Sequence, residues 1–497
     1  MKKASCLSIA LLLFSVAFWG CQEKIDEASA EKQFVWSAMN YWYYWQQDVP
    51  ELADDQGFFK DEQDFHDYLR EYPDTETLFN DLLFSPENFG ENIGEDDFSF
   101  FIDDYEVFQQ RQQGITTSFG FELGLSLVQN TNNIYGYVQY VVPNSPADRA
   151  GLERGDVFRS INGTDLTVNN YRSVLNSDNY EIGLADYSDG VVTKNGNTIS
   201  LGKEIVTENP IFLSKTIETG FSKVGYLMFN AFQTNSHEEL NEVFGNFNSE
   251  GIDELILDLR YNGGGAVATS RTLCSMISGL GDSDEFGTYS FNSKRAPQNN
   301  STINFYTEVP IYNENGNKAG EISKNTVSLD RLFVLADYKT ASASESVINA
   351  LSAYMEVIVI GTQTVGKDDV SITLYDTEAP YFSPENANPS HKMAIQPIVA
   401  KLVNANGESK NDGYIPDFMI SERQFLSNLP PLGDENEPLL ATALQQITGA
   451  PPAKSLDTTP ETQIEVLRTT RPKPESGLYI LPEEAKELGL ISPTSSH

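Results

Sequence analysis

The stretch Glu254-Leu-Ile-Leu-Asp-Leu-Arg-Tyr-Asn-Gly-Gly-Gly265 joins an apolar run to three consecutive glycines. The apolar run predicts a strand, and the helical periodicity of residues 266–278 predicts a helix directly after the glycines. Further apolar runs at residues 223–229, 332–336 and 356–360 predict more strands, with helical spacing between them. This part of the chain is therefore expected to form a layered domain of strands and helices.

The glycine turn at residues 263–265 has a chemical interpretation and a structural one. Glycines leave backbone N–H groups unobstructed, and the N-terminus of the following helix carries a partial positive charge. Such a turn can hold a developing oxyanion. It lacks the spacing of the nucleotide-binding glycine loops, and a tight strand-to-helix connection explains it equally well.

Two further motifs, Thr340-Ala-Ser-Ala-Ser-Glu345 and Thr364-Val-Gly-Lys367, each follow a predicted strand. They suggest a serine nucleophile, Ser342, activated by a lysine base, Lys367. A lysine can act as a base when burial lowers its pKa, because desolvation penalises the ammonium. A Ser-His-Asp hydrolase is disfavoured because none of the four histidines lies in a segment typical of a nucleophile-bearing turn; these are His66, His237, His391 and His497.

Each residue of this pair also has a simpler explanation. Ser342 and Glu345 match the Ser-x-x-Glu capping box of a helix expected at residues 344–355. Lys367, taken alone, is typical of a solvated surface lysine.

A different pattern precedes this domain, because residues 119–127 and 135–142 alternate as strands do. The stretch Asn144-Ser-Pro-Ala-Asp-Arg-Ala-Gly-Leu152 predicts a short helix, and Gly155-Asp156 and Ile161-Asn-Gly163 follow it. Residues 115–205 resemble a PDZ domain, which implies capture of extended peptide ends at a sheet edge. The loop that usually holds the peptide carboxylate corresponds to Ser118, Phe119, Gly120 and Phe121. A scaffold module without peptide affinity is the alternative.

Taken in order, the glycine turn, the Ser342 motif and the Lys367 motif behind a PDZ domain resemble the C-terminal processing, or tail-specific, peptidase family. The resemblance covers about residues 115–430. It implies an α+β multidomain protein whose catalytic domain is a crotonase-like ββα spiral, with the PDZ domain as an insertion that controls substrate entry. It also implies that Ser342 is the nucleophile, Lys367 the general base, and the N–H groups of Gly264 and Ala343 the oxyanion donors.

The chain departs from the family at one position. The family commonly has a glutamine four residues after the lysine, and here that residue is Ser371. A serine hydroxyl is shorter, and Asp368 and Asp369 would raise the lysine pKa if they lie close. Gln363 is a possible substitute for the missing glutamine.

The expected domains follow from these shifts in pattern. Residues 31–110 are acidic and aromatic with helical spacing, and their aromatic side chains are expected to form a core rather than a binding groove. After about residue 430 the chain becomes rich in Pro, Thr and Glu and is expected to be peripheral. The predicted divisions are a signal peptide at 1–20, an N-terminal helical domain at 21–114, a PDZ domain at 115–205, a catalytic domain at 206–432 and a C-terminal tail at 433–497.

The first twenty residues predict export. Lys2 and Lys3 precede an apolar run too short to span a bilayer comfortably, which ends at Gly20-Cys21. This arrangement resembles a bacterial lipoprotein signal, which implies a lipid on Cys21 and a place in the cell envelope facing the periplasm or cell surface. Ordinary signal cleavage is the alternative. Cys274 would then be the only cysteine of the mature chain apart from Cys21, so no internal disulfide is expected.

The composition disfavours two classes of binding partner. The net charge of -39 would repel nucleic acids and anionic lipid surfaces. The mechanism implied by the resemblance, amide hydrolysis through an acyl-enzyme, needs no metal or other cofactor, and its substrates would be extended or unfolded proteins and peptides. Two alternatives stay open: a peptide-binding protein with weak or no catalysis on the same scaffold, and acyl-CoA chemistry, which export disfavours.

Overall fold

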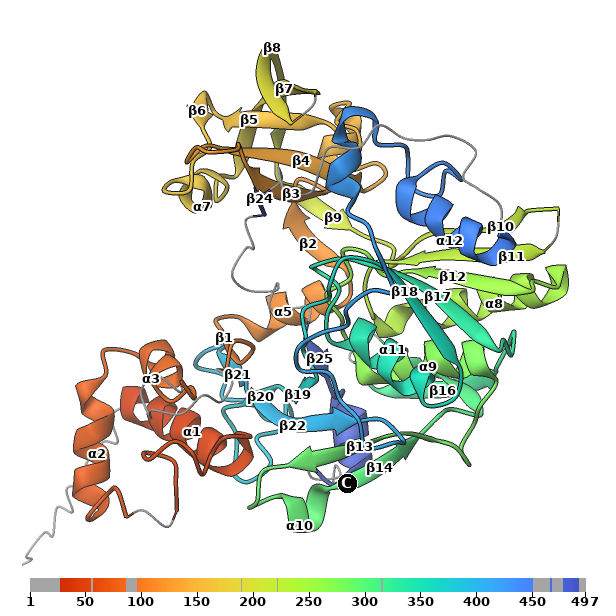
Figure 1. Cartoon of the computed structure of the whole chain (residues 1–497). Coiled ribbons are helices and arrows are strands. Elements are labelled where there is room, and N and C mark those ends of the chain that lie inside the picture. Colours follow the sequence, from red (N-terminus) through yellow and green to blue (C-terminus); the bar gives the residue numbers. More distant parts are fainter. Residues whose placement is uncertain are drawn as a thin grey trace, which may run out of the picture.

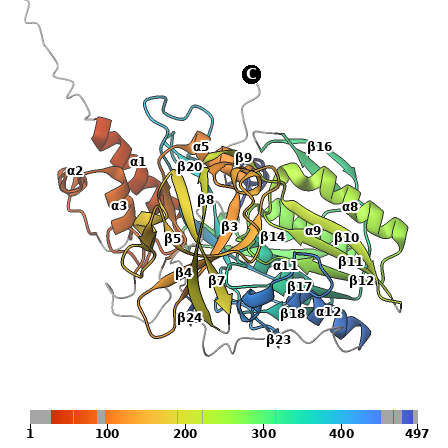
Figure 2. The same cartoon turned by 90° about the horizontal axis from the view of Figure 1, so that it is seen from above.

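The computed structural model describes residues 27–54, 57–85, 96–188, 190–220, 222–313, 316–449, 465–466 and 477–490. The predicted signal peptide and Cys21 lie outside these residues. Figure 1 shows the N-terminal helices at one end, the PDZ strands at the top and the layered catalytic region beside them. Figure 2, from above, shows the PDZ strands in front, with the N-terminal helices and the catalytic sheet to either side.

A six-stranded sheet forms the centre of the catalytic region, in the order β10-β11-β12-β17-β18-β23. The strands are β10 (Ile211–Glu218), β11 (Lys223–Phe229), β12 (Glu254–Asp258), β17 (Arg331–Ala336), β18 (Glu356–Gly361) and β23 (Phe418–Met419). From β11 to β23 all neighbours run parallel, and only β10 is antiparallel to β11. The four strands predicted from apolar runs are all present in this sheet.

Helices cover both faces of this sheet, as a buried parallel sheet requires. One face packs against α8 (His237–Glu250), α9 (Val267–Ser278) and α11 (Ala343–Ser352), and the other against α12 (Pro438–Thr448). In Figure 1, α12 lies above the sheet and the other three lie below it. Cys274, on α9, is a free, fully buried thiol, as expected for a small core residue.

A second sheet of five strands, in the order β14-β13-β22-β19-β25, completes the catalytic region. The strands are β13 (Glu285–Phe291), β14 (Ser301–Asn304), β19 (Asp369–Ser371), β22 (Ile398–Val403) and β25 (Leu478–Tyr479). Smaller elements here are η1 (Thr234–Ser236), α10 (Ala296–Asn299), the hairpin β15 (Glu308–Tyr312) and β16 (Lys318–Ser323), and η2 (Glu422–Asn428). Because β25 belongs to the tail, the expectation that the tail is peripheral is wrong for this segment: Leu478, Ile480 and Leu490 are core residues. A short helix, α13 (Pro482–Glu487), follows β25.

The PDZ strands form a sheet in the order β24-β3-β4-β5-β7-β8, with β6 paired to β5. The elements are β3 (Phe121–Leu127), β4 (Ile134–Val141), α6 (Pro146–Arg149), β5 (Val157–Ile161), β6 (Thr164–Asp165), α7 (Tyr171–Val174), β7 (Asn179–Ser188), β8 (Val191–Gly202) and β24 (Glu465–Val466). Ser145 caps α6 as predicted, through its Oγ and the N–H of Asp148. Strands β2 (Ile115–Ser118) and β9 (Glu204–Thr207) pair antiparallel where the chain enters and leaves this sheet.

The N-terminal helices are α1 (Glu27–Trp42), α2 (Glu62–Glu71), α3 (Thr75–Asp81) and α5 (Tyr105–Gln112). Strand β1 (Phe100–Ile102) joins β21 (Ala394–Gln396) and β20 (Leu374–Tyr375) in a three-stranded sheet. Trp42 and Tyr43 are fully buried, so the aromatic residues form a core as predicted. That core is continuous with the core under the six-stranded sheet, which fixes the helices against the catalytic region.

Candidate active site

Three loops meet at the carboxyl ends of neighbouring parallel strands. The glycine turn follows β12, Ser342 follows β17, and Lys367 follows β18. The carboxyl ends of parallel strands lie at one edge of a sheet, which is where α/β sheets place ligands. The three motifs predicted from the sequence therefore lie at the same edge.

Ser342 lies at the start of α11 in a strained backbone conformation, with φ 63° and ψ -111°. A residue with a side chain adopts this region at a cost, and such strain concentrates at functional sites. The side chain is 1% exposed, and its Oγ has no hydrogen-bond partner among the described residues. Only half of the predicted capping box forms, since the Ser342 N–H donates to Glu345 while Oγ caps nothing. Capping therefore does not account for the hydroxyl.

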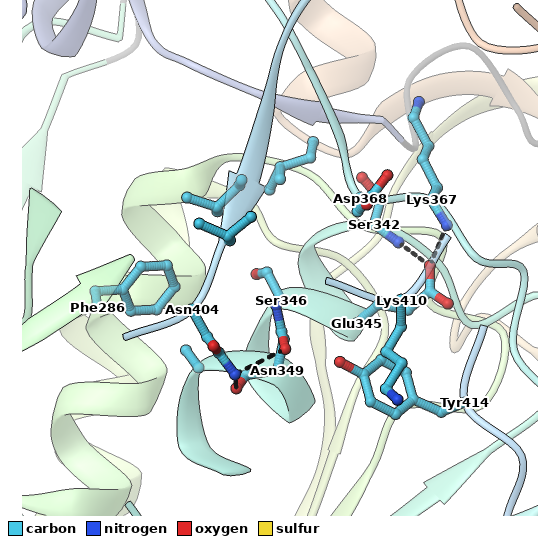
Figure 3. Close-up of a pocket in the computed structure, with 14 residues that line it drawn as sticks. Phe286, Ser342, Glu345, Ser346, Asn349, Lys367, Asp368, Asn404, Lys410 and Tyr414 are labelled. Carbon is cyan, nitrogen blue, oxygen red and sulfur yellow. Dashed lines mark hydrogen bonds between the residues drawn. The ribbon is translucent and has the colours of Figure 1, made fainter. Parts of the chain in front are cut away.

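Glu345 connects the nucleophile loop to the lysine loop. Its Oε2 accepts the N–H groups of Ser342 and Lys367, each at 2.8 Å. Its Oε1 accepts the Gly366 N–H at 2.7 Å and the Thr364 hydroxyl at 2.6 Å. Figure 3 shows the Ser342 and Lys367 nitrogens converging on this carboxylate. Burial raises the Glu345 pKa, and the four donors oppose that shift. One buried carboxylate thus fixes the backbone of both candidate catalytic residues.

Lys367 is 4% exposed, and its amine lies in a largely dry environment. Burial lowers its pKa to about 8, while the charges of Asp369, Asp96 and Glu345 act in the opposite direction. Among the described residues, no hydrogen bond or ion pair reaches Nζ, and that includes the hydroxyl of Ser342. Its neighbours are the ring of Phe98, whose centroid is 4.5 Å away, and Gly477, where an added Cβ would come within 2.8 Å of Nζ.

The two residues expected to orient the lysine are engaged elsewhere. Gln363 donates from Nε2 to the Asp412 carbonyl at 2.7 Å. Ser371 donates to the Leu478 carbonyl at 3.1 Å and accepts from Gln396 Nε2 at 2.9 Å. A lysine-orienting role for either residue stays a prediction without a contact to Nζ in this structure.

The two acidic residues that follow Lys367 share one cation as their ion-pair partner. Lys401 forms an ion pair with Asp368 at 2.9 Å and a second, closer one with Asp369. Asp369 still raises the Lys367 pKa, but less than burial lowers it. The acidic pair therefore does not keep the lysine fully charged near neutral pH.

The predicted oxyanion donors differ in their availability. Ala343 begins α11, so its N–H belongs to the first helical turn, which lacks intrahelical acceptors. The Gly264 N–H donates to Asn262 Oδ1 at 2.9 Å, so it is occupied in this state. Gly265, at φ 141°, can only be glycine, because a Cβ would lie 2.4 Å from the Phe232 carbonyl oxygen.

The C-terminal segment lines this site, which the sequence did not predict. The Tyr479 N–H donates to the Gly265 carbonyl at 3.2 Å, and the Ile480 N–H donates to the Ser371 carbonyl at 3.1 Å. Strand β25 thereby connects the glycine turn to β19, and Gly477 at its start closes the space beside the lysine amine.

A cavity of about 170 Å³ connects the PDZ loop to the glycine turn. Its lining includes Ser118, Gly120 and Phe121 on one side and residues 263–265 on the other. Tyr479 separates it from a second cavity of about 730 Å³. Ser342 and Lys367 instead line a space of only about 20 Å³, large enough for about one water molecule. Ser342 is therefore closed off from the cavity beside the PDZ loop in this state.

The predicted PDZ loop is held from within its own domain. Phe119 stacks on Tyr180 with ring centroids 3.9 Å apart. The Gly120 carbonyl accepts the Val142 N–H at 2.8 Å and the Ser145 hydroxyl at 3.0 Å. The outer edge of β3 pairs with β24 of the same chain. This pairing covers only Ser126 and Leu127, at the end of β3 far from the loop at residues 118–121.

The loop that carries Ser342 also contacts the PDZ strands directly. Lys339, three residues before Ser342, forms an ion pair with Glu122 at 2.6 Å and donates to the Leu123 carbonyl at 2.7 Å. A change at β3 therefore has a short physical route to Ser342.

No cluster of three or more histidine, cysteine, aspartate or glutamate side chains suited to a metal ion occurs in the described part of the chain. Within the same residues, no helix combines the length and the apolar character needed to cross a membrane.

Three family models match the chain. Residues 223–419 match peptidase family S41, residues 30–100 match the peptidase S41 N-terminal domain, and residues 137–182 match a PDZ domain. A candidate S41 protease of Bacteroides fragilis, solved by crystallography, is 25% identical with a TM-score of 0.59, covering 84% of this chain and 97% of that one. The predicted α+β multidomain fold with its N-terminal and PDZ domains is confirmed, while the boundaries drawn from the sequence stay predictions.

Two curated relatives are similar to about half of this chain. The carboxyl-terminal-processing protease of Picosynechococcus sp. is 26% identical over 277 residues, which cover 52% of this chain and 57% of that protein. The chloroplastic carboxyl-terminal-processing peptidase 3 of Arabidopsis thaliana is 27% identical over 281 residues, covering 52% of this chain and 50% of the relative. The matches thus span little more than half the length of these relatives.

Proposed function

Because the chain belongs to peptidase family S41, we propose that it is a serine endopeptidase that cuts extended or unfolded proteins with Ser342 and Lys367. One combination of observations carries this proposal. Ser342 has a strained backbone and an unbonded hydroxyl, and Lys367 is buried with a lowered pKa. One carboxylate, that of Glu345, holds the backbone N–H groups of both residues. A lysine with a pKa of about 8 is partly neutral at physiological pH, as a general base must be.

In the proposed reaction, neutral Lys367 takes the proton of Ser342 Oγ as the oxygen attacks the substrate carbonyl. The Ala343 N–H, and the Gly264 N–H once released from Asn262, stabilise the oxyanion. The C–N bond then breaks, and the lysine returns its proton to the leaving amine. Water hydrolyses the acyl-serine with Lys367 again as base. Since Nζ is not bonded to Oγ here, substrate binding must bring the two together.

Substrate capture at the PDZ domain is part of the proposal. The cavity of about 170 Å³ places the loop at residues 118–121 and the glycine turn in one space, so a peptide end held by the loop would lead to the catalytic centre. We also propose export and lipidation at Cys21, with the protein in the cell envelope, on the pattern of residues 1–21. The test is the mass of the N-terminal peptide of the purified protein, and a peptide mass without a lipid would contradict the anchor.

The test of function is hydrolysis of a defined peptide library by the purified protein, with products identified by mass spectrometry. We expect cleavage by the wild type and none by Ser342→Ala. If the wild type binds peptides and cuts none, the protein is the alternative from the sequence, a peptide-binding protein on a peptidase scaffold.

We expect kcat/KM to rise with pH through about 8 and then level off. Below the lysine pKa the amine is protonated and cannot accept the serine proton, so activity falls about tenfold for each pH unit. The measurement is kcat/KM for one peptide between pH 6 and pH 10, under conditions where chemistry limits the rate. A flat profile over this range would contradict a lysine base.

Replacing Gly477 with alanine is expected to lower kcat/KM by about 10²-fold with little change in KM. The new Cβ would lie 2.8 Å from Nζ, so the flexible lysine must move, and a displacement of about 1 Å at a catalytic group has this cost. Steady-state kinetics of the variant check this expectation. Gly320→Ala is the matched control, because a Cβ there meets nothing within 4 Å and its backbone is not in the left-handed region. Equal activity of the Gly477 variant and the wild type would show that Gly477 does not restrict the position of the lysine amine.

A further inference from the structure

The amine of Lys367 lies in a pocket built by regions far apart in the sequence. Phe98, from the segment between the N-terminal helices and β1, faces Nζ with its ring, whose centroid is 4.5 Å away. Gly477 of the C-terminal segment forms a second wall, and Asp369 of β19 contributes charge. An aromatic face attracts an ammonium and also keeps water from it. The side chain that touches the base therefore comes from the N-terminal domain.

Asp96, two residues before Phe98, supplies a fixed charge to the same pocket. It is 5% exposed and accepts three hydrogen bonds, from the Tyr43 hydroxyl at 2.7 Å and from the N–H groups of Phe98 and Ser99 at 3.0 and 2.8 Å. No ion pair neutralises Asp96 within the described residues, whereas Asp369 is paired with Lys401. Its charge favours the ammonium form of Lys367, after that of Asp369.

This segment is held firmly against the catalytic region. The Ser99 hydroxyl accepts the Ile398 N–H at 2.8 Å, and the Tyr44 N–H donates to the Ile398 carbonyl at 2.9 Å. Directly after Ser99, β1 pairs with β21. Because Tyr44, Ser99 and β1 are all attached to the catalytic region, we expect Asp96 and Phe98 to keep a constant position beside the lysine.

We propose that Asp96 and Phe98 are the positioning residues of Lys367. Neither Ser371 nor Gln363, the residues expected to have this role, contacts the lysine amine. Phe98 covers the amine and excludes water from it, and Asp96 holds the Phe98 backbone through its N–H and adds negative charge to the pocket. The N-terminal domain thereby completes the catalytic centre. This inference rests on the proposed function, in which Lys367 is the base.

The two residues have opposite expected effects on the lysine. Asp96→Asn removes the charge and keeps one of the two acceptor oxygens, enough for the N–H groups of Phe98 and Ser99. The midpoint of the pH profile therefore shifts down by about one unit. Phe98→Ala admits water to the amine, which favours the ammonium, so the midpoint shifts up by about one unit. Phe98→Leu keeps an apolar cover and loses only the attraction of the ring, so the midpoint does not rise. The other groups acting on Nζ, Asp369 with its partner Lys401 and Glu345, are unchanged in all three variants.

The experiment titrates the Lys367 side chain directly by NMR of protein with isotope-labelled lysine, the signal being assigned by its loss in Lys367→Met. Asp97→Asn is the control, because it removes one negative charge next to Asp96 from an exposed position, and we expect no shift from it. Opposite shifts for Asp96→Asn and Phe98→Ala support the proposal. Unchanged lysine pKa values in both, or equal shifts from Asp96→Asn and Asp97→Asn, would overturn it.

The titration separates this proposal from the proposed function. A wild-type protein that cuts no peptide contradicts the function, while the lysine pKa still reports on Asp96 and Phe98. Unfolding midpoints identify any variant that fails to fold. Phe98→Ala and Phe98→Leu remove side-chain atoms but leave the hydrogen bonds of Asp96 in place. The comparison between them therefore tests only the apolar cover over the lysine amine.

Discussion

Ser342→Ala is expected to lower kcat/KM for peptide hydrolysis at least about 10³-fold without changing the fold. The hydroxyl has no hydrogen-bond partner among the described residues, so its removal leaves no buried group unsatisfied. A lost nucleophile costs orders of magnitude in rate, because only binding and oxyanion stabilisation remain. The measurement is kcat/KM for a cleavable peptide together with the thermal unfolding midpoint, which should equal that of the wild type.

The lysine gives the matched half of this prediction. Lys367→Met keeps the length of the side chain and is expected to lose about 10²- to 10⁴-fold in kcat/KM. Lys367→Arg keeps the positive charge but cannot lose a proton, so it should be as inactive as the methionine variant. Activity retained by the arginine variant would mean that Lys367 contributes charge and not base catalysis.

Glu345→Ala is expected to have the second-largest effect, on activity and stability together. Four donors, from Ser342, Lys367, Gly366 and Thr364, would lose their acceptor inside the protein. Leaving such donors unpaired costs about 1 to 3 kcal/mol each, less what water can recover. We expect the unfolding midpoint to fall by at least about 5 °C. We also expect kcat/KM to fall at least about 10²-fold, because the two loops lose their common anchor.

Glu345→Gln is the control, since the amide keeps the volume and one acceptor oxygen for one of the two donor pairs. It should lie between the wild type and the alanine variant in both measurements. The role assigned to Glu345 fails if the alanine variant has wild-type kcat/KM, even if the protein is less stable. Loss of stability alone would show a structural residue and no coupling between the loops.

Much of the catalytic region could be predicted because its strands are continuous apolar runs. Strand β11 was predicted to the residue, and β12, β17 and β18 to within one residue at their ends. Parallel strands bring their carboxyl ends to one edge, so motifs directly after these strands had to lie close together. Ser342, Lys367 and the glycine turn were identified from their sequence motifs, and the parallel order of the strands, which the sequence did not predict, explains why they meet.

The surroundings of the lysine could not be predicted, because they depend on long-range packing. Phe98 and Gly477 lie 269 residues before and 110 residues after Lys367 in the chain. Phe98 is one of many aromatic residues in the N-terminal region, and Gly477 follows a segment without periodic pattern. Only the common core of the N-terminal helices and the catalytic region, and the pairing of β25 with β19, bring them to the amine.

Only part of the role of Glu345 could be predicted from the sequence. The Ser-x-x-Glu spacing correctly indicated a local contact to the Ser342 N–H. It could not indicate that the same carboxylate also accepts the N–H groups of Gly366 and Lys367, from a loop beyond the next strand. Likewise, the motif suggested a free Gly264 N–H, whereas the side chain of Asn262, two residues earlier, occupies it.

Covalent labelling with a fluorophosphonate, followed by peptide mapping, tests the serine-lysine pair most directly. The reagent carries a short peptide, because substrate binding must open the space at Ser342 and bring Nζ and Oγ together. We predict a single adduct on Ser342, whose rate of formation rises with pH through about 8 and falls at least about 10²-fold in Lys367→Met. An adduct on a different serine, or labelling of Ser342 at the same rate in Lys367→Met, would contradict the account.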